Sequence, residues 1–108
     1  MVARIWQGRT RPKMGDAYYS YLEQTGLKEY HATDGCRGVF VLRQDADERS
    51  DYVIVSLWDD LAAVRRFAGA DPERAVYYPD DDQYFPPEER RPRVDHYDVV
   101  ASPLAARG

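Results

Sequence analysis

Cysteine and histidine are scarce in this chain: Cys36 is the only cysteine, and His31 and His96 are the only histidines. A lone cysteine cannot form a disulfide within the chain or build the sulfur cage of a structural zinc site. The histidines are far apart in the sequence and offer no metal-ligand spacing. We therefore expect no metal centre, and the free thiol fits a reducing compartment.

Long apolar runs, a basic excess and glycine-rich loops are also missing. No stretch is long enough to cross a bilayer, and the first residues lack the apolar core of a signal peptide. The formal net charge of −4 gives no broad positive field for nucleic acid or an anionic membrane. No phosphate-binding glycine motif occurs. We expect a cytoplasmic protein with no nucleic-acid or membrane partner.

Aromatic residues are plentiful, led by nine tyrosines. With 108 residues, the chain has the usual size of one domain, and we assign residues 1–108 to a single domain. A core of this size is modest, so a dimer would add stability.

The apolar pattern predicts the order strand, helix, strand, strand, helix, strand. Alternation and β-branched residues predict strands at residues 2–8, 38–43, 52–58 and 94–100. The first helix is expected to begin at Pro12 and to end at Gly26, and residues 27–33 could add one more turn of helix after it. Its apolar stripe is Met14, Ala17, Tyr18, Tyr21 and Leu22.

The second helix is expected to begin at an Asp59 N-cap and to end at Gly69. Its buried stripe is Leu61, Val64, Phe67 and Ala68. Asp71-Pro72-Glu73 predicts a further short helix, which Pro79 ends. Residues 79–93 carry too much proline and charge for regular structure, and we expect the aspartates at 80–82 to be solvated there.

This element order is that of the split, ferredoxin-like α+β fold, an antiparallel sheet with helices on one face. The third strand is nearly continuous in apolar residues, which indicates burial on both faces. Helices can cover only one of them. We therefore expect a second copy to cover the other, which gives a homodimeric α/β barrel.

The segments "RIWQG", "SLWDDLAAVRRFAG", "DPERAVYYPDDD" and "VDHYDVV" resemble the antibiotic biosynthesis monooxygenase (ABM) family of the dimeric α/β-barrel superfamily. The resemblance implies the ferredoxin-like fold and a homodimer. It also implies a cofactor-independent monooxygenase, or a related tailoring enzyme, that acts on an aromatic, polyketide-like small molecule.

Two features of the family are changed here. Trp58 matches the tryptophan of the cofactor-free oxygenases, but Ile54 and Val64 stand where those enzymes have an asparagine and a tyrosine. Their mechanism therefore cannot be carried over intact.

Compared with the haem-degrading branch of the family, this chain has Tyr77 near the position of the axial histidine and Phe67 near that of the haem-distorting tryptophan. A tyrosine can ligate haem iron, so a haem-binding variant using Tyr77 or His96 stays an alternative.

His96 and Arg4 are the candidate catalytic residues. A neutral His96 could take a proton from a phenol or enol, and the alternative is a half-buried structural histidine. Arg4 shares a strand face with Trp6 and could hold an anionic substrate oxygen. Its alternative is an ion pair with Asp98 or with a carboxylate across the dimer.

The candidate pocket walls are aromatic residues at the helix–sheet gap, whose rings suit a flat ligand. They are Trp6, Trp58, Phe67, Tyr77 and Tyr18. Core packing is the alternative for each of them, and a binding protein of the same fold without catalysis is the alternative for the chain.

Overall fold

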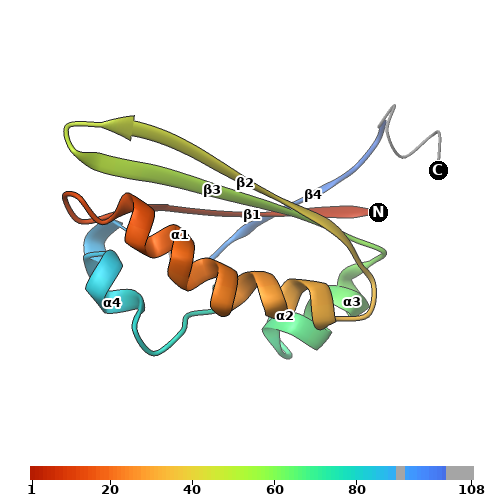
Figure 1. The fold of residues 1–108 in the computed structure, drawn as a ribbon. Coiled ribbons are helices and arrows are strands. Elements are labelled where there is room, and N and C mark those ends of the chain that lie inside the picture. Colours follow the sequence, from red (N-terminus) through yellow and green to blue (C-terminus); the bar gives the residue numbers. More distant parts are fainter. Residues whose placement is uncertain (90–91, 102–108) are drawn as a thin grey trace.

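Four antiparallel strands form one open sheet, and the helices cover one of its faces (Figure 1). The computed structural model describes residues 1–89 and 92–101. The strands are β1 (Val2–Arg9), β2 (Cys36–Ala46), β3 (Arg49–Trp58) and β4 (Asp95–Asp98), in the order β2-β3-β1-β4. The helices are α1 (Gly15–Gln24), α2 (Gly26–Ala32), α3 (Leu61–Ala68), α4 (Asp81–Tyr84) and the 3₁₀ turn η1 (Pro87–Glu89). The ferredoxin-like α+β fold is confirmed.

The two faces of the sheet differ in burial. Along β3, residues from Ser50 to Trp58 alternate between buried and half-buried, because successive side chains point to opposite faces. The buried set packs under the helices with Trp6, Tyr18, Leu22 and Phe67. On the other face, the side chains of Phe40 and Leu42 are each 50% exposed. The expected burial of the third strand on both faces needs a second copy as the cover and stays a prediction; in the single chain the β3 side chains on this face are half-buried.

Two helices follow β1. The first, α1, ends at Gln24 with Thr25 as its C-cap, next to the expected Gly26, and Gly26 begins α2, where one further turn of helix was expected. The helix also starts at Gly15 and not at Pro12, and Ala17 of the expected stripe is exposed. A side chain at Gly26 would place its Cβ 3.0 Å from Leu22 Cδ1, so glycine allows the close approach of the two helices.

The cap of α3 is Asp60 and not Asp59. Asp60 Oδ1 accepts from the Ala63 backbone N–H at 2.9 Å, whereas Asp59 pairs with Arg37. The helix buries Ala63, Val64 and Phe67, while Leu61 of the expected stripe is 40% exposed. Gly69 ends the helix with φ 93°, as the sequence predicts.

The short helix expected at Asp71-Pro72-Glu73 is only a turn, and residues 75–78 form neither helix nor strand. We call residues 71–80 the strap. The strap pairs with the chain before β4: the Ala75 N–H donates to the Pro92 carbonyl at 3.0 Å, and the Val94 N–H to the Glu73 carbonyl at 2.8 Å. The β-branched and aromatic residues at 76–78 have a low helix propensity, which disfavours a helix here.

Residues 79–93 are not an irregular loop throughout, because they contain α4 and η1. The predicted strand at 94–100 is shorter than expected and forms β4 between Asp95 and Asp98. Within the part of the chain that the structure describes, no helix is long and apolar enough to span a membrane.

Candidate functional site

A small cavity lies between the helix-covered face of the sheet and the helices. Its floor comes from β1 and β3, its roof from α1 and α2, and its rim from α3, the strap and α4. Its volume is about 20 Å³ of space for the centre of a water molecule, which is room for one water. The lining residues that bear on its chemistry are Arg4, Trp6, Tyr18, Tyr30, Phe67, Val76, Tyr78 and Asp81.

Arg4 is a buried cation in the floor of this cavity. It lies mid-strand in β1, opposite Ser56 of β3 and His96 of β4, and is only 1% exposed. Its Nη2 donates to the Arg74 carbonyl oxygen in the strap at 2.6 Å, and its guanidinium carbon lies 5.4 Å from the Phe67 ring centroid. No atom of the described residues accepts from Arg4 Nε.

The ion pair expected between Arg4 and Asp98 is not formed. No carboxylate of residues 1–89 or 92–101 pairs with Arg4. Burial lowers the pKa of the Arg4 guanidinium, and the nearby Tyr30 hydroxyl counteracts part of that shift. An arginine nevertheless stays charged in a protein, so this part of the cavity carries a positive charge whose partners, the Arg74 carbonyl and the Tyr30 hydroxyl, are neutral.

Tyr30 faces the same part of the cavity from α2. Burial raises its pKa to about 12, although the neighbouring Arg4 and a hydrogen bond with Ser56 act in the opposite direction. The hydroxyl is therefore protonated at neutral pH and can donate to an oxygen held by Arg4. Its position had a sequence signal, because Tyr18, Leu22, Gly26 and Tyr30 recur at every fourth residue along one helical face.

His96 lies beside Arg4 in the sheet but is not part of the cavity wall. It is half-buried, and its Nε2 has no hydrogen-bond partner among the residues described. Burial, and then the charge of Arg4, lower its pKa from 6.5. The imidazole is therefore neutral at pH 7 and keeps a nitrogen that can accept a proton.

The expected aromatic walls are divided between the cavity and other places. Trp6, Tyr18 and Phe67 line the cavity, and Trp6 Nε1 is buried with no acceptor in the described chain. Trp58 is fully buried in the core, where its Nε1 donates to Ser56 Oγ at 2.9 Å. Tyr77 lines a separate outer hollow with Arg65 and Arg66. Trp58 and Tyr77 thus lie outside the cavity lining.

Asp81 lines the cavity but was expected to be solvated. It is 7% exposed, and its Oδ2 accepts from the Tyr78 backbone N–H at 2.7 Å. Asp80 and Asp82 on either side of it are exposed. A helical reading of residues 81–85 would have shown the difference, because Asp81 and the buried Phe85 share one face at a spacing of four.

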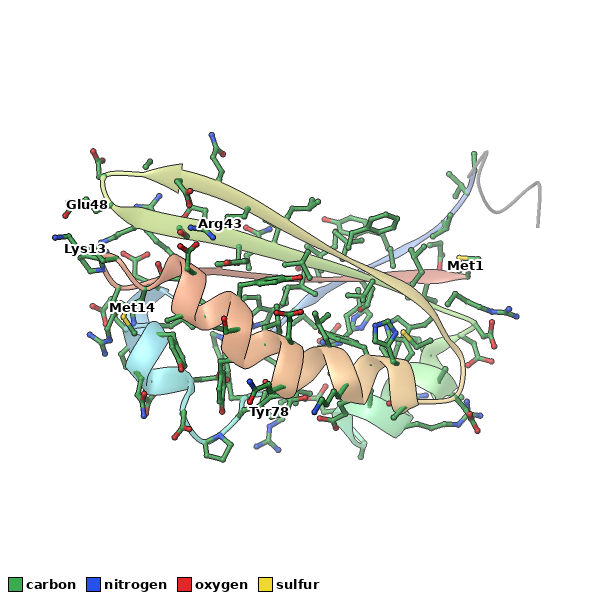
Figure 2. All side chains as sticks on the ribbon, in the orientation of Figure 1. Met1, Lys13, Met14, Arg43, Glu48 and Tyr78 are labelled. Carbon is green, nitrogen blue, oxygen red and sulfur yellow. The ribbon has the colours of Figure 1, made fainter. Side chains whose placement is uncertain are left out.

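The strap closes the cavity on one side with Val76 and Tyr78. The Tyr78 hydroxyl donates to Glu29 Oε2 of α2, and the Asp80 N–H donates to the Tyr21 hydroxyl of α1 at 3.1 Å. Figure 2 shows Tyr78 on the helix side of the sheet, beside α1 and α2. Burial and the Glu29 carboxylate raise the pKa of Tyr78, which keeps it a donor.

Neither Tyr77 nor His96, the candidate haem ligands, lines the inner cavity. The described residues also include no group of three or more histidine, cysteine or carboxylate side chains placed to hold a metal ion. The donor set at the cavity is a guanidinium, an indole, tyrosine hydroxyls and one carboxylate, which suits an organic ligand with a polar oxygen better than a metal.

Comparison with protein families gives one match, to antibiotic biosynthesis monooxygenase, over residues 1–76. The matched part runs from β1 through α3 and into the strap, and so includes Arg4, Trp6, Tyr18 and Phe67. His96 and Asp81 lie beyond it. A comparison with curated proteins found no match. Because the family match covers well over half of its residues, this chain belongs to the antibiotic biosynthesis monooxygenase family.

Proposed function

We propose that this protein is a cofactor-independent monooxygenase, or a closely related tailoring enzyme, acting on an aromatic small molecule bound in the cavity between sheet and helices. The family supports the reaction class. The observation that carries the proposal is Arg4, a buried cation in an aromatic-lined cavity whose Nε has no acceptor among the described residues. Such a group is suited to stabilise an oxyanion.

In this chemistry the substrate itself supplies the electrons. A phenol or enol loses its proton, and the resulting anion reduces dioxygen. For an anthrone, the ring CH₂ becomes a carbonyl with one oxygen atom, and the other oxygen leaves as water with the two hydrogens. The protein has to exclude bulk water, orient the ring and stabilise the anion.

We assign the stabilisation of the substrate anion to Arg4, with the Tyr30 hydroxyl as a second hydrogen-bond donor. His96, which is neutral at pH 7, is the proposed acceptor of the substrate proton. Because His96 lies beside Arg4 but outside the cavity wall, this proton has to pass along the sheet face to reach it. Trp6, Tyr18 and Phe67 are the proposed ring-binding walls.

The family's asparagine and tyrosine are replaced by Ile54, which lines the cavity, and Val64, which is fully buried. These replacements support the second candidate function, a binding protein that holds an aromatic ligand without oxidising it.

Oxygen uptake with anthrone separates the two functions. We expect uptake by the native protein, a loss of about 100-fold or more in His96→Ala if general-base catalysis is removed, and a normal rate in His31→Ala. Equal rates in native protein and His96→Ala would remove the proposed role of His96. Ligand binding without oxygen uptake would instead support the second candidate function, a binding protein.

A haem-binding variant has its own signature. Purified protein titrated with haem is expected to show no Soret shift, because the candidate ligands do not line the cavity. A shift that disappears in Tyr77→Phe or His96→Ala would instead establish haem binding.

A further inference from the structure

We propose that the cavity binds its ligand as an organic monoanion, whose negative oxygen takes the place of the Arg74 carbonyl on Arg4 and thereby releases the strap. The inference rests on the proposed function for the location of the site, and it names the class of ligand and the part of the protein that moves.

The first support is the electrostatic state of Arg4. Burying a charge is costly unless the charge is paired and hydrogen-bonded. Arg4 is 1% exposed, yet the described residues give it only neutral partners: one backbone carbonyl, the Tyr30 hydroxyl and the face of Phe67. The groups that act on its pKa are Tyr30 and Tyr78, and no carboxylate is among them. A ligand carboxylate or phenolate would supply the missing negative charge.

The second support is the geometry of the free donor. The guanidinium fork presents Nε and a terminal nitrogen to the two oxygens of a carboxylate, which is the strongest arrangement for this pair of groups. Nε has no acceptor in the described chain, and Nη2 donates to the Arg74 carbonyl. An anion can therefore complete the fork by displacing one neutral acceptor.

The third support is the size of the cavity. About 20 Å³ holds a water molecule but no aromatic ring, so a ligand requires one wall to move. The strap is the wall without helix or strand. Its side-chain fastenings are Arg4 to the Arg74 carbonyl, Tyr78 to Glu29 and Tyr21 to the Asp80 N–H. Arg4, which would bind the ligand's anionic oxygen, thus also makes one of the hydrogen bonds that hold the strap over the cavity.

The rest of the cavity lining limits the charge of the ligand. Arg4 is the one cation among the described residues that line the cavity, and the rings of Trp6, Tyr18 and Phe67 offer no second positive charge. A second anionic group on the ligand would be buried without a partner, which is costly. The preferred ligand therefore has one anionic oxygen at Arg4 and an apolar or neutral body against the aromatic walls.

A matched pair of probes tests the charge preference. 2-Naphthoate and 2-naphthamide have the same ring, but only the first is an anion at pH 7. By isothermal titration, we expect the native protein to bind the naphthoate at least about tenfold more tightly, since a charge-assisted pair is roughly twice as strong as a neutral one. Arg4→Met should lose this preference. Arg74→Met should keep it, because Arg74 acts through its carbonyl and its side chain is exposed.

Arg4→Met should fold, because an apolar side chain of similar length replaces a poorly compensated buried charge. Arg4→Lys is the second variant: it keeps the charge, loses the fork and should show an intermediate preference. Equal binding of the two probes by native protein, or a preference that survives in folded Arg4→Met, would overturn the proposal, as would failure of 2-naphthoate to bind.

Hydrogen exchange tests the release of the strap. Naphthoate is expected to speed exchange at the strap amides, including that of Asp80, whereas naphthamide is not. Slower hydrogen exchange with naphthoate would mean that the strap closes on the ligand instead. It would contradict the proposal that the ligand oxygen replaces the Arg74 carbonyl on Arg4. None of these measurements involves oxygen, so anion binding without oxygen uptake would end the proposed function alone, and oxygen uptake together with equal binding of the two probes would end the anion proposal alone.

Discussion

At the scale of single residues, the unusual feature is a pair of polar side chains placed next to one another on an apolar sheet face. Arg4 and His96 are cross-strand neighbours, and each has a buried nitrogen without a partner in the described chain. A buried polar atom without a hydrogen-bond partner lowers the stability of the fold, and buried polar groups in proteins therefore normally have partners. Proteins tolerate that loss mainly at sites where the unsatisfied groups meet a ligand or a reacting atom.

The lowered pKa of His96 predicts a pH dependence of stability. Below about pH 6.5 a histidine in the unfolded chain takes up a proton, whereas His96 in the folded chain resists protonation. The unfolded state then binds more protons, so folding stability falls as the pH drops from about 6.5 toward the lower, folded-state pKa. His96→Gln should remove this contribution to the fall.

Urea unfolding at about pH 7.5 and pH 5.5 measures the effect. The loss of unfolding free energy between the two pH values is expected to be smaller in His96→Gln than in native protein. His31→Gln is the control, because that histidine is exposed at the end of α2. Identical pH slopes in native protein and His96→Gln would show that the fold does not disfavour the charged imidazole.

Strand alternation was enough to predict part of the site at this scale. It placed Arg4 and Trp6 on one face of β1, and both line the cavity. It could not separate Trp58, which has the same alternation but ends in the core with Ser56 as its partner. Asp81 was missed because three adjacent aspartates look alike in sequence, and only the turn of α4 turns one of them inward.

At the scale of elements, local patterns predicted the strands and the helices that bury a stripe, while the strap depended on distant residues. β3 and α3 follow from alternation and helical spacing. The strap contains no helix, and it pairs through its backbone with the chain around Pro92 and Val94. That pairing is tertiary, and it overrode the helix-start signal of Asp71-Pro72-Glu73, which produced only a turn.

The hydrogen bond between the strap and α2 can be removed by deleting a single oxygen atom, that of the Tyr78 hydroxyl. Tyr78→Phe deletes the hydroxyl that donates to Glu29 and keeps the ring in the cavity wall. We expect a loss of about 1 kcal/mol in unfolding free energy, the usual net value of a hydrogen bond. Amide exchange should quicken along the strap but not along β3.

Tyr19→Phe provides the matched control, since Tyr19 is 40% exposed on α1. It should leave both stability and strap exchange at their native values. If Tyr78→Phe left strap exchange unchanged, the Tyr78–Glu29 hydrogen bond would not be what keeps the cavity closed, and the remaining fastenings would have to do so.

At the scale of the whole molecule, the sheet is covered on one face and bare on the other (Figure 1). The bare face is apolar across its centre, where the register aligns Phe40 of β2, Val55 of β3 and Ile5 of β1. Phe40 and Leu42 are each 50% exposed, and Tyr97 is 59% exposed. We propose a second copy of this chain as the cover, since a two-fold axis would place the same apolar surface on both partners.

A charge at the centre of this face tests the homodimer. Light scattering at micromolar concentration should give twice the chain mass for native protein and the single mass for Phe40→Glu, because each two-fold interface would receive the substitution twice and bury both charges. Phe40→Glu should still fold, since half of the side chain is already exposed. Leu61→Glu, at a 40% exposed position on α3, should leave the mass unchanged. A native protein with the mass of one chain would contradict the dimer and leave the bare face to another partner.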